Sequence, residues 1–185
     1  MNTAWRLHQR RLWPRWVAMC LLLLALAACD KPGAPAPSTL VEGQAFPSFM
    51  LDFIAGTDGE RQSLAGKTVV LNIWATWCAP CRREMPDLER LSKTLDPARF
   101  VVLGLSTDRD ALLASEFLTR HRITFANYFD PDGTVSRQLG LRVYPATFVI
   151  APNRILLRRL TGWHDWNSPD MLGLLEALDR AQTRP

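Results

Sequence analysis

The first 28 residues lack acidic side chains, although they contain Arg6, Arg10, Arg11 and Arg15. The whole chain has 22 basic and 18 acidic residues, so without those four arginines the numbers are equal at 18. The rest of the chain is therefore neutral and lacks the excess positive charge that nucleic-acid binding requires. We expect no nucleic-acid partner.

The chain also lacks an uninterrupted apolar run of about 20 residues, which is the length a helix needs to cross a bilayer. The run from Val17 to Ala28 follows the arginine-rich residues 1–16 and is typical of the apolar part of a signal peptide. We predict that residues 1–28 form a signal peptide, and the alternative is an uncleaved membrane anchor. Both place the rest of the chain outside the cytoplasm, because the arginines stay inside.

The residues Leu26-Ala27-Ala28-Cys29 resemble the signal for cleavage and acylation in bacterial lipoproteins, and the alternative is an ordinary cleavage site. Two acyl chains on Cys29 would anchor the protein stably. Asp30 follows, and in lipoproteins of enteric bacteria this is typical of retention at the inner membrane. We predict a lipid-anchored protein on the periplasmic face of the inner membrane, with residues 29–39 as a proline-rich tether and residues 40–185 as the folded domain.

Cysteine is scarce in the predicted domain, which contains only Cys78 and Cys81. A four-cysteine zinc site needs a second pair, and the two histidines of the domain are poorly spaced for a mixed site. Two cysteines separated by two residues at a strand-to-helix junction favour redox chemistry, because unpaired N–H groups at a helix start stabilise a thiolate. We predict that Cys78 is the nucleophile and Cys81 the resolving thiol, without a metal or other cofactor. The alternative is a purely structural disulfide.

Strands and helices are predicted to alternate around this pair. Strands are expected at residues 68–74, 100–105, 146–150 and 155–160, and helices at 79–94, from Thr107 or Asp108 to His121, at 133–139 and from Ser168 onward. Residues 49–54 and a turn at 56–59 indicate an opening hairpin. The last two strands are joined by a turn too short for a crossover and must be antiparallel. The pattern predicts an α/β fold with a central mixed sheet flanked by helices.

The segment Asn72-Ile73-Trp74-Ala75-Thr76-Trp77-Cys78-Ala79-Pro80-Cys81, with Glu84, Pro86 and Val143–Phe148, resembles the thioredoxin superfamily. The chain is most similar to its membrane-tethered TlpA/ResA/DsbE-like branch, over about residues 40–180. The resemblance implies a thioredoxin-like fold in which Pro86 kinks the active-site helix. It also implies a cis-proline at position 145 beside the disulfide, with substrate bound by Trp77, Tyr144 and Pro145.

Glu84 follows Cys81 by three residues on the same helix face, and Asn72 stands where cytoplasmic thioredoxins carry a buried acid. The resemblance implies that Glu84 is the acid or base near the thiols. We hypothesise that Glu84 carries the proton of Cys81 and raises the thiol pKa by like-charge repulsion. The alternative is a solvent-exposed glutamate that pairs with a helix neighbour.

Two further groups of side chains lie near these motifs. Arg82 and Arg83 are expected either to be solvated or to stabilise the attacking thiolate. Trp163, His164 and Trp166 are expected to pack in the core and a loop, and the alternative is a partner-binding patch.

These features predict an extracytoplasmic thiol–disulfide oxidoreductase that acts as a monomer and reduces protein disulfides. The resemblance implies a membrane thiol transporter as electron donor, and apocytochrome c or the copper-site cysteines of cytochrome oxidase as clients. The alternatives are a thiol oxidase or isomerase, a copper-binding metallochaperone that uses the same two thiolates, and a lipoprotein scaffold with a vestigial site. The function rests on the resemblance, because a fold alone does not determine function.

Overall fold

The computed structural model describes residues 40–49, 52–53, 64 and 66–182. The predicted signal peptide, the tether with Cys29 and the turn at residues 56–59 lie outside the described residues. Within the described part, no helix is both long enough and apolar enough to span a bilayer.

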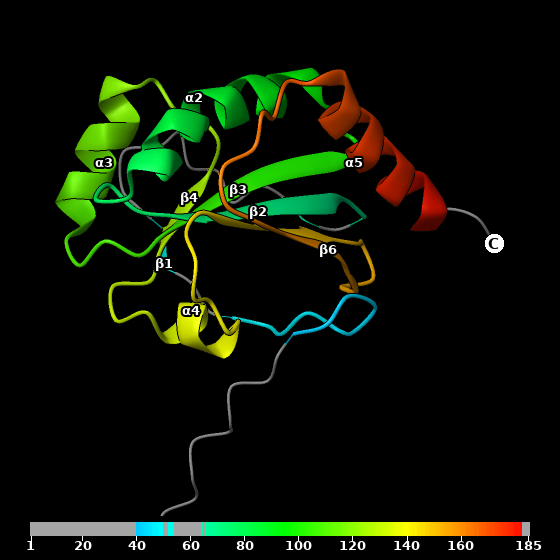
Figure 1. The fold of residues 1–185 in the computed structure, drawn as a ribbon, viewed down its shortest axis with the longest axis horizontal. Helices are drawn as coiled ribbons and strands as arrows, with labels where there is room; N and C mark the ends of the chain where they lie inside the picture. Colours follow the sequence, from blue (N-terminus) through cyan, green and yellow to red (C-terminus); the bar gives the residue numbers. More distant parts are fainter. Residues whose placement is uncertain (1–39, 50–51, 54–63, 65, 183–185) are drawn as a thin grey trace, which may run out of the picture. The chain divides into compact units, whose positions relative to one another are not determined.

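A six-stranded sheet forms the centre of the domain, in the order β1-β4-β3-β2-β5-β6 (Figure 1). The strands are β1 (Asp52–Phe53), β2 (Thr68–Trp74), β3 (Phe100–Ser106), β4 (Asn127–Phe129), β5 (Ala146–Ile150) and β6 (Leu156–Thr161). The pairs β2–β3 and β3–β4 are parallel, whereas β1–β4, β2–β5 and β5–β6 are antiparallel. The predicted mixed sheet and antiparallel final pair are confirmed.

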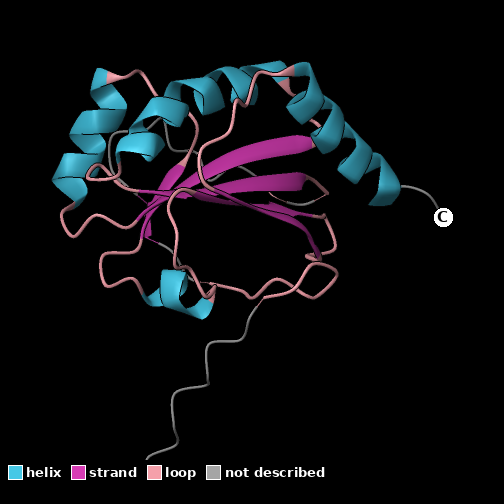
Figure 2. Cartoon of the chain, in the orientation of Figure 1, coloured by secondary structure: helices cyan, strands magenta, loops and turns pink. Residues whose placement is uncertain are grey.

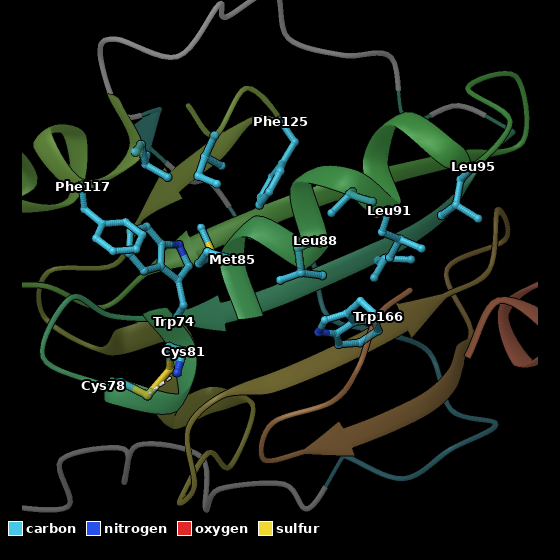
Figure 3. Packing of buried hydrophobic residues seen from close by; sticks show 14 of the residues in the cluster. Trp74, Cys78, Cys81, Met85, Leu88, Leu91, Leu95, Phe117, Phe125 and Trp166 are labelled. Atoms are coloured by element: carbon cyan, nitrogen blue, oxygen red, sulfur yellow. Dashed lines mark hydrogen bonds between the residues drawn. A yellow bond between two sulfur atoms is a disulfide. The ribbon is translucent and has the colours of Figure 1, made fainter. Parts of the chain in front are cut away.

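Helices cover both faces of this sheet (Figure 2). One face carries α2 (Ala79–Thr94), α3 (Ala111–Arg120) and α5 (Pro169–Gln182), and the other carries α4 (Thr134–Gln138). Every residue of β2 and β3 is buried, as expected for central strands with helices on both sides. The predicted apolar face of α2 is confirmed, because Met85, Leu88 and Leu91 are fully buried against the sheet (Figure 3).

The middle of β3 approaches a buried polar side chain so closely that only glycine fits. Asn127 Oδ1 accepts a hydrogen bond from Trp74 Nε1 at 2.8 Å, and Asn127 Nδ2 donates to the Phe125 carbonyl at 3.0 Å. A Cβ atom on Gly104 would lie 1.8 Å from Asn127 Oδ1. The hydrogen bond from Trp74 Nε1 to Asn127 Oδ1 fixes the Trp74 ring. This ring packs against Phe117, with ring centroids 5.3 Å apart.

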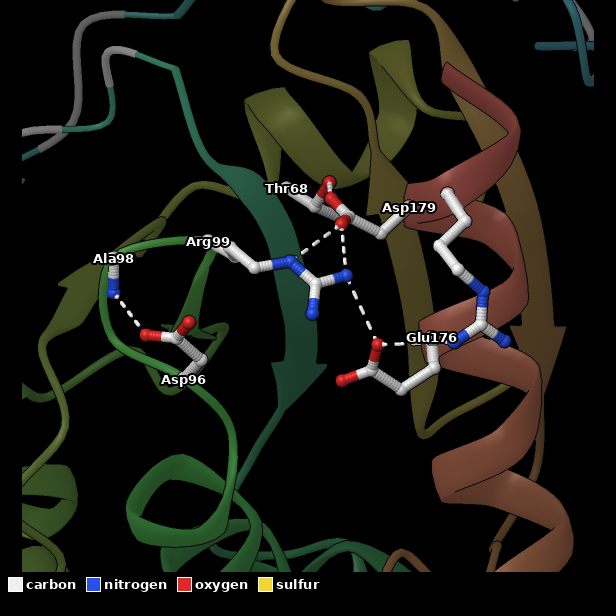
Figure 4. Close-up of polar contacts among 7 residues, drawn as sticks. Thr68, Asp96, Ala98, Arg99, Glu176 and Asp179 are labelled. Carbon is white, nitrogen blue, oxygen red and sulfur yellow. Dashed lines mark hydrogen bonds and ion pairs between the residues drawn. The ribbon is translucent and has the colours of Figure 1, made fainter. Parts of the chain in front are cut away.

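A cluster of charged side chains holds the end of α5 against the sheet (Figure 4). Asp179 is buried, and its carboxylate accepts from Thr68 Oγ1 at 2.6 Å and from Arg99 Nε at 3.0 Å. Arg99 also forms an ion pair with Glu176 at 3.0 Å. These contacts join α5 to the starts of β2 and β3, and so fix the helix that follows the loop containing Trp166.

The segment just before β1 runs along the outer edge of β6. Gly43 N donates to the Leu156 carbonyl at 2.8 Å, and Leu156 N donates to the Gln44 carbonyl at 2.9 Å. Further along β6, Arg159 N donates to Glu42 Oε1 at 3.0 Å. Residues 42–44 therefore occupy backbone groups of the edge strand.

Two predicted element boundaries differ from the structure. The predicted opening strand pairs with β4, with Asp52 opposite Phe129, and the rest of the predicted hairpin lies outside the described residues. The cap of α3 is Asp110, whose Oδ1 accepts from Leu112 N at 2.9 Å, and not Thr107 or Asp108. Asp108 is instead buried, and its carboxylate accepts hydrogen bonds from Thr76 in the loop before α2. The three-residue strand β4 was not predicted, because so short a run shows no periodicity.

Candidate active site

The two cysteines form a disulfide at the start of α2. Cys78 is the N-cap residue, and its Sγ accepts a hydrogen bond from Cys81 N at 3.3 Å. Cys78 is 6% exposed whereas Cys81 is fully buried, so Cys78 is the more accessible residue of the pair. The first turn of α2 carries no acidic residue. The unpaired N–H groups and the helix dipole are therefore free to stabilise a thiolate on Cys78.

The loop before β5 contacts Trp77, the residue that precedes Cys78. The Tyr144–Pro145 peptide bond is cis, as the resemblance implies, and Pro145 is buried. Its carbonyl accepts from Gly162 N at 2.8 Å. Trp77 is 61% exposed and meets Tyr144 edge to face, with ring centroids 5.3 Å apart. A ring pair of which Trp77 is exposed and Tyr144 is half-buried therefore lies next to Cys78 in the chain.

The loop before Cys78 is fastened to the loop after β3. Both carboxylate oxygens of Asp108 accept from Thr76 N, at 3.1 and 3.0 Å, and Oδ1 also accepts from Thr76 Oγ1 at 2.6 Å. Arg82 is exposed and donates to the Thr76 carbonyl at 2.5 Å, while Arg83 is exposed. A hollow of about 480 Å³ lies beside the Thr76–Asp108 hydrogen bonds, between Trp77 and Leu113. The hydrogen bonds between Asp108 and Thr76 hold the neighbouring Trp77 backbone in place at the surface.

Glu84 is fully buried on α2 and accepts hydrogen bonds from two other elements, β2 and the loop before α5. Its Oε1 accepts from Asn72 Nδ2 of β2 at 2.8 Å. Its Oε2 accepts from Trp166 Nε1 at 3.2 Å and from His164 N at 3.4 Å. Asn72 Nδ2 also donates to Thr147 Oγ1 of β5 at 3.0 Å. The alternative of an exposed Glu84 paired with a helix neighbour is therefore wrong.

Burial raises the pKa of Glu84 from 4.5 to about 7. The loss of hydration is the largest cause, because it disfavours the charged form, and the nearby carboxylate of Asp87 adds to it. The hydrogen bonds from Asn72, Trp166 and His164 N act in the opposite direction. Glu84 is thus poised to exchange a proton near neutral pH.

The three residues Trp163, His164 and Trp166 separate into different environments. Trp166 is fully buried, which confirms the expected packing for this residue, and it also binds Glu84. The His164 ring lies 5.8 Å from the Trp166 ring and is half-buried. Trp163 is 48% exposed, so the predicted packing is wrong for this residue.

The model of the AhpC/TSA family matches residues 42–159, which is more than half of the chain. The chain belongs to the AhpC/TSA family. Among relatives in this family, the thiol-disulfide oxidoreductase ResA of Geobacillus thermodenitrificans is 32% identical over 155 residues, covering 83% of this chain and 89% of that protein. The thioredoxin-like protein YneN of Bacillus subtilis is 34% identical over 111 residues, covering 59% of this chain and 65% of that protein.

Solved structures of similar proteins share the fold. A protein assigned as the thiol:disulfide interchange protein DsbE of Chlorobium tepidum superposes with a TM-score of 0.65 at 25% identity, covering 76% of this chain and 99% of its own. A secreted disulfide oxidoreductase of Mycobacterium tuberculosis gives 0.57 at 25% identity, covering 70% and 95%. The predicted thioredoxin-like fold and TlpA/ResA/DsbE-like membership are confirmed. This AhpC/TSA family member is a thiol–disulfide oxidoreductase.

Sequence reasoning identified the disulfide, the cis-proline and Glu84, and the structure brings all three to one end of α2. It named Asn72 and Trp166 but did not predict that both donate hydrogen bonds to Glu84. Thr147 gave no signal, because one threonine in a strand is unremarkable. The role of Asp108 in holding Thr76 was also missed, because its position after β3 indicated a helix cap.

We expect the Glu84→Gln variant to lose a pH dependence of stability. Since the pKa of Glu84 is about 7 in the folded protein and 4.5 in the reference state, the folded protein binds more protons between these values. Stability from this group is therefore present below pH 4.5 and is lost as the pH rises to 7, by on the order of 3 kcal/mol. Urea unfolding of the oxidised protein at pH 5 and pH 8 measures the loss.

Glutamine stays uncharged, so the free energy of unfolding of Glu84→Gln relative to the wild type should rise between these two pH values. Glu116→Gln serves as the control, because Glu116 is exposed on α3. Equal pH dependence in both variants would contradict the assignment.

Proposed function

We propose that the protein reduces disulfides of client proteins outside the cytoplasm. The observation that carries this proposal is the difference between the two sulfurs: Cys78 reaches the surface at a helix start, and Cys81 is buried one turn inside the same helix. A buried acid with a pKa near 7 follows Cys81 by three residues. This arrangement supports attack by the first sulfur and resolution by the second.

The reaction begins with the reduced protein. The Cys78 thiolate attacks a client disulfide, forms a mixed disulfide and releases one client thiolate. Cys81 then loses its proton, and its thiolate attacks the Cys78 sulfur and displaces the second client thiolate. Two electrons have passed from the enzyme dithiol to the client, and the protein is left with the Cys78–Cys81 disulfide.

Glu84 is proposed to carry the proton of Cys81. Residues three apart on a helix are neighbours, and this spacing of Cys81 and Glu84 supports the proposal. The ionised carboxylate accepts the proton, and its charge raises the thiol pKa until it does so. Replacing Glu84 by Gln should remove one ionisation from the pH dependence of client reduction, and an unchanged profile would argue against this role.

Trp77, Tyr144 and Pro145 are proposed to bind the client. Tyr144 precedes the cis bond at the start of β5, where its backbone can pair with an extended client segment. The exposed Trp77 ring beside it offers an apolar surface next to Cys78.

The location and the partners are further parts of this proposal. Cys29 is proposed to carry a lipid anchor after removal of residues 1–28, and metabolic labelling with palmitate that depends on Cys29 would test it. One of the similar solved structures is a secreted disulfide oxidoreductase, which supports a place outside the cytoplasm. A membrane thiol transporter is the proposed donor, and apocytochrome c or cysteines of a copper site are the proposed clients.

We expect the reduction potential of the Cys78–Cys81 pair to lie near that of thioredoxin, at about −270 mV. A potential in this range favours donation of electrons to clients. Equilibration of the purified full-length protein in dithiothreitol buffers, followed by alkylation and mass spectrometry, measures the potential. A value near that of the strong oxidant DsbA, at about −120 mV, would reverse the proposed direction.

A further inference from the structure

Asn72 leaves a polar atom buried without a partner beside the candidate site. Its side chain is fully buried on β2, and its Oδ1 has no hydrogen-bond partner. Among the residues described, it is the one buried side-chain oxygen in this condition. Its nitrogen, by contrast, donates both to Glu84 Oε1 at 2.8 Å and to Thr147 Oγ1 at 3.0 Å. Buried acceptors are nearly always paired, so this one requires an explanation.

The surroundings of Glu84 suit only one of its two charge states. The three groups that contact its carboxylate are all N–H donors: Asn72 Nδ2, Trp166 Nε1 and His164 N. An ionised carboxylate accepts all three. A protonated Glu84 has a hydrogen to donate, and none of these three groups accepts it. The unpaired oxygen of Asn72 can provide an acceptor, because it belongs to the same amide that now donates to Glu84.

We propose that Asn72 is a positioning residue whose side-chain amide turns end for end as Glu84 gains or loses a proton. With Glu84 ionised, the amide nitrogen faces the carboxylate, as in the structure. With Glu84 protonated, Oδ1 takes that place and accepts from the carboxylic acid. It also accepts from the Thr147 hydroxyl, which can donate as well as accept. The two ends of the amide are nearly equal in size, so the neighbouring atoms keep their places.

The protonation state of Glu84 controls this rotation of the Asn72 amide. Asn72 and Thr147 do not titrate, and the charged or titratable groups near Glu84 lie on α2 itself and in the loop before α5. Asp87 follows it on α2 and raises its pKa, His164 contacts it from the loop before α5, and the thiol of Cys81 precedes it when reduced. A pH-dependent change at the Asn72 amide therefore reports the proton on its hydrogen-bond partner.

The inference rests on the proposed role of Glu84 as a proton carrier, and extends it. If the amide serves both states, the gain or loss of a proton by Glu84 is accommodated by the rotation of one side-chain torsion of Asn72. No backbone element has to move, although the site lies among fully buried side chains.

Nuclear magnetic resonance of the full-length oxidised protein in detergent micelles tests the turn directly. The Glu84 carboxyl carbon is followed with pH, together with cross-peaks between the Asn72 amide protons and the Thr147 methyl group. We expect these cross-peaks above the pKa of Glu84 and their loss below it, in step with the carboxyl signal. In Glu84→Gln they should be independent of pH. Constant cross-peaks in the wild type overturn the inference, whether or not Glu84 titrates.

A matched pair of variants distinguishes a turning amide from a fixed donor. Trp166→Phe removes a donor that favours only the ionised form, so it should raise the pKa of Glu84. Asn72→Leu removes a partner of both forms, so it should change this pKa by less. A fixed amide predicts the reverse order, because the Asn72 bond is the shorter, at 2.8 Å against 3.2 Å. That reverse order would overturn the inference.

Failure of the proposed role of Glu84 appears in a separate measurement. The rate of Cys81 alkylation against pH is compared between the reduced wild type and Glu84→Gln. Equal profiles would remove Glu84 from the thiol chemistry, and the cross-peaks would still report whether Asn72 turns.

Discussion

Replacing Cys78 by Ser is expected to reduce the rate of client disulfide reduction by about a thousandfold or more, to the level of uncatalysed exchange. Cys78 is the sulfur of the pair that reaches the surface, and serine provides neither a thiolate nor a redox couple. Reduction of insulin or of a peptide disulfide with dithiothreitol as donor measures the loss.

Cys81→Ser is the matched variant for the same reaction. It keeps the Cys78 thiol but lacks the thiol that resolves the mixed disulfide, so it should attack once and stay bound to its client. Mass spectrometry of the trapped complexes then identifies the clients. If Cys78→Ser kept its activity in the cell, the protein would act as a scaffold with a vestigial site.

The second large effect is expected for stability, in Gly104→Ala. The added methyl group would lie 1.8 Å from Asn127 Oδ1 and displace the acceptor of the Trp74 hydrogen bond. Overpacking of a core and loss of a buried hydrogen bond each cost about 1–3 kcal/mol, so together we expect a loss of about 3 kcal/mol or more. Urea unfolding at one pH measures it.

Gly173→Ala provides the control for Gly104→Ala. Gly173 lies on the exposed side of α5, and a Cβ there meets nothing within 4 Å. The same substitution should therefore stabilise the protein, by up to about 1 kcal/mol. Adding Asn127→Ala to Gly104→Ala removes the clashing oxygen. The double variant should therefore lose less stability than the sum of the losses in the two single variants. A loss below about 1 kcal/mol for Gly104→Ala alone would contradict the close approach.

Local sequence patterns were sufficient for much of the fold. The apolar spacing of α2 and the Ser168-Pro169 start of α5 identify these helices, since both depend on neighbours within one or two turns. The cap of α3 was placed two or three residues early, at Asp108 or Thr107, because Asp108 and Asp110 are equally suitable caps by sequence. Only the packed structure shows that Thr76, 32 residues away, binds the first of them.

The same limit applies to the site. The spacing of Cys78 and Cys81 is local and indicated the chemistry at once, and a resemblance supplied Glu84 and Pro145. The contacts that set the pKa of Glu84 come from β2 and from the loop before α5, up to 82 residues away. No periodicity or spacing links Trp166 to a carboxylate on another helix, so this partner required the structure.

Residues 42–44 cover part of the outer edge of β6, and this affects how neighbouring molecules can associate. Edge strands with unpaired N–H and C=O groups are templates for pairing with another molecule, and proteins commonly cover or charge them. Here the backbone of Leu156 in β6 already pairs with residues 43 and 44, and Arg159 N donates to the Glu42 carboxylate. At high local concentration, these contacts lower the risk that β6 pairs with a neighbouring domain in a continuous intermolecular sheet.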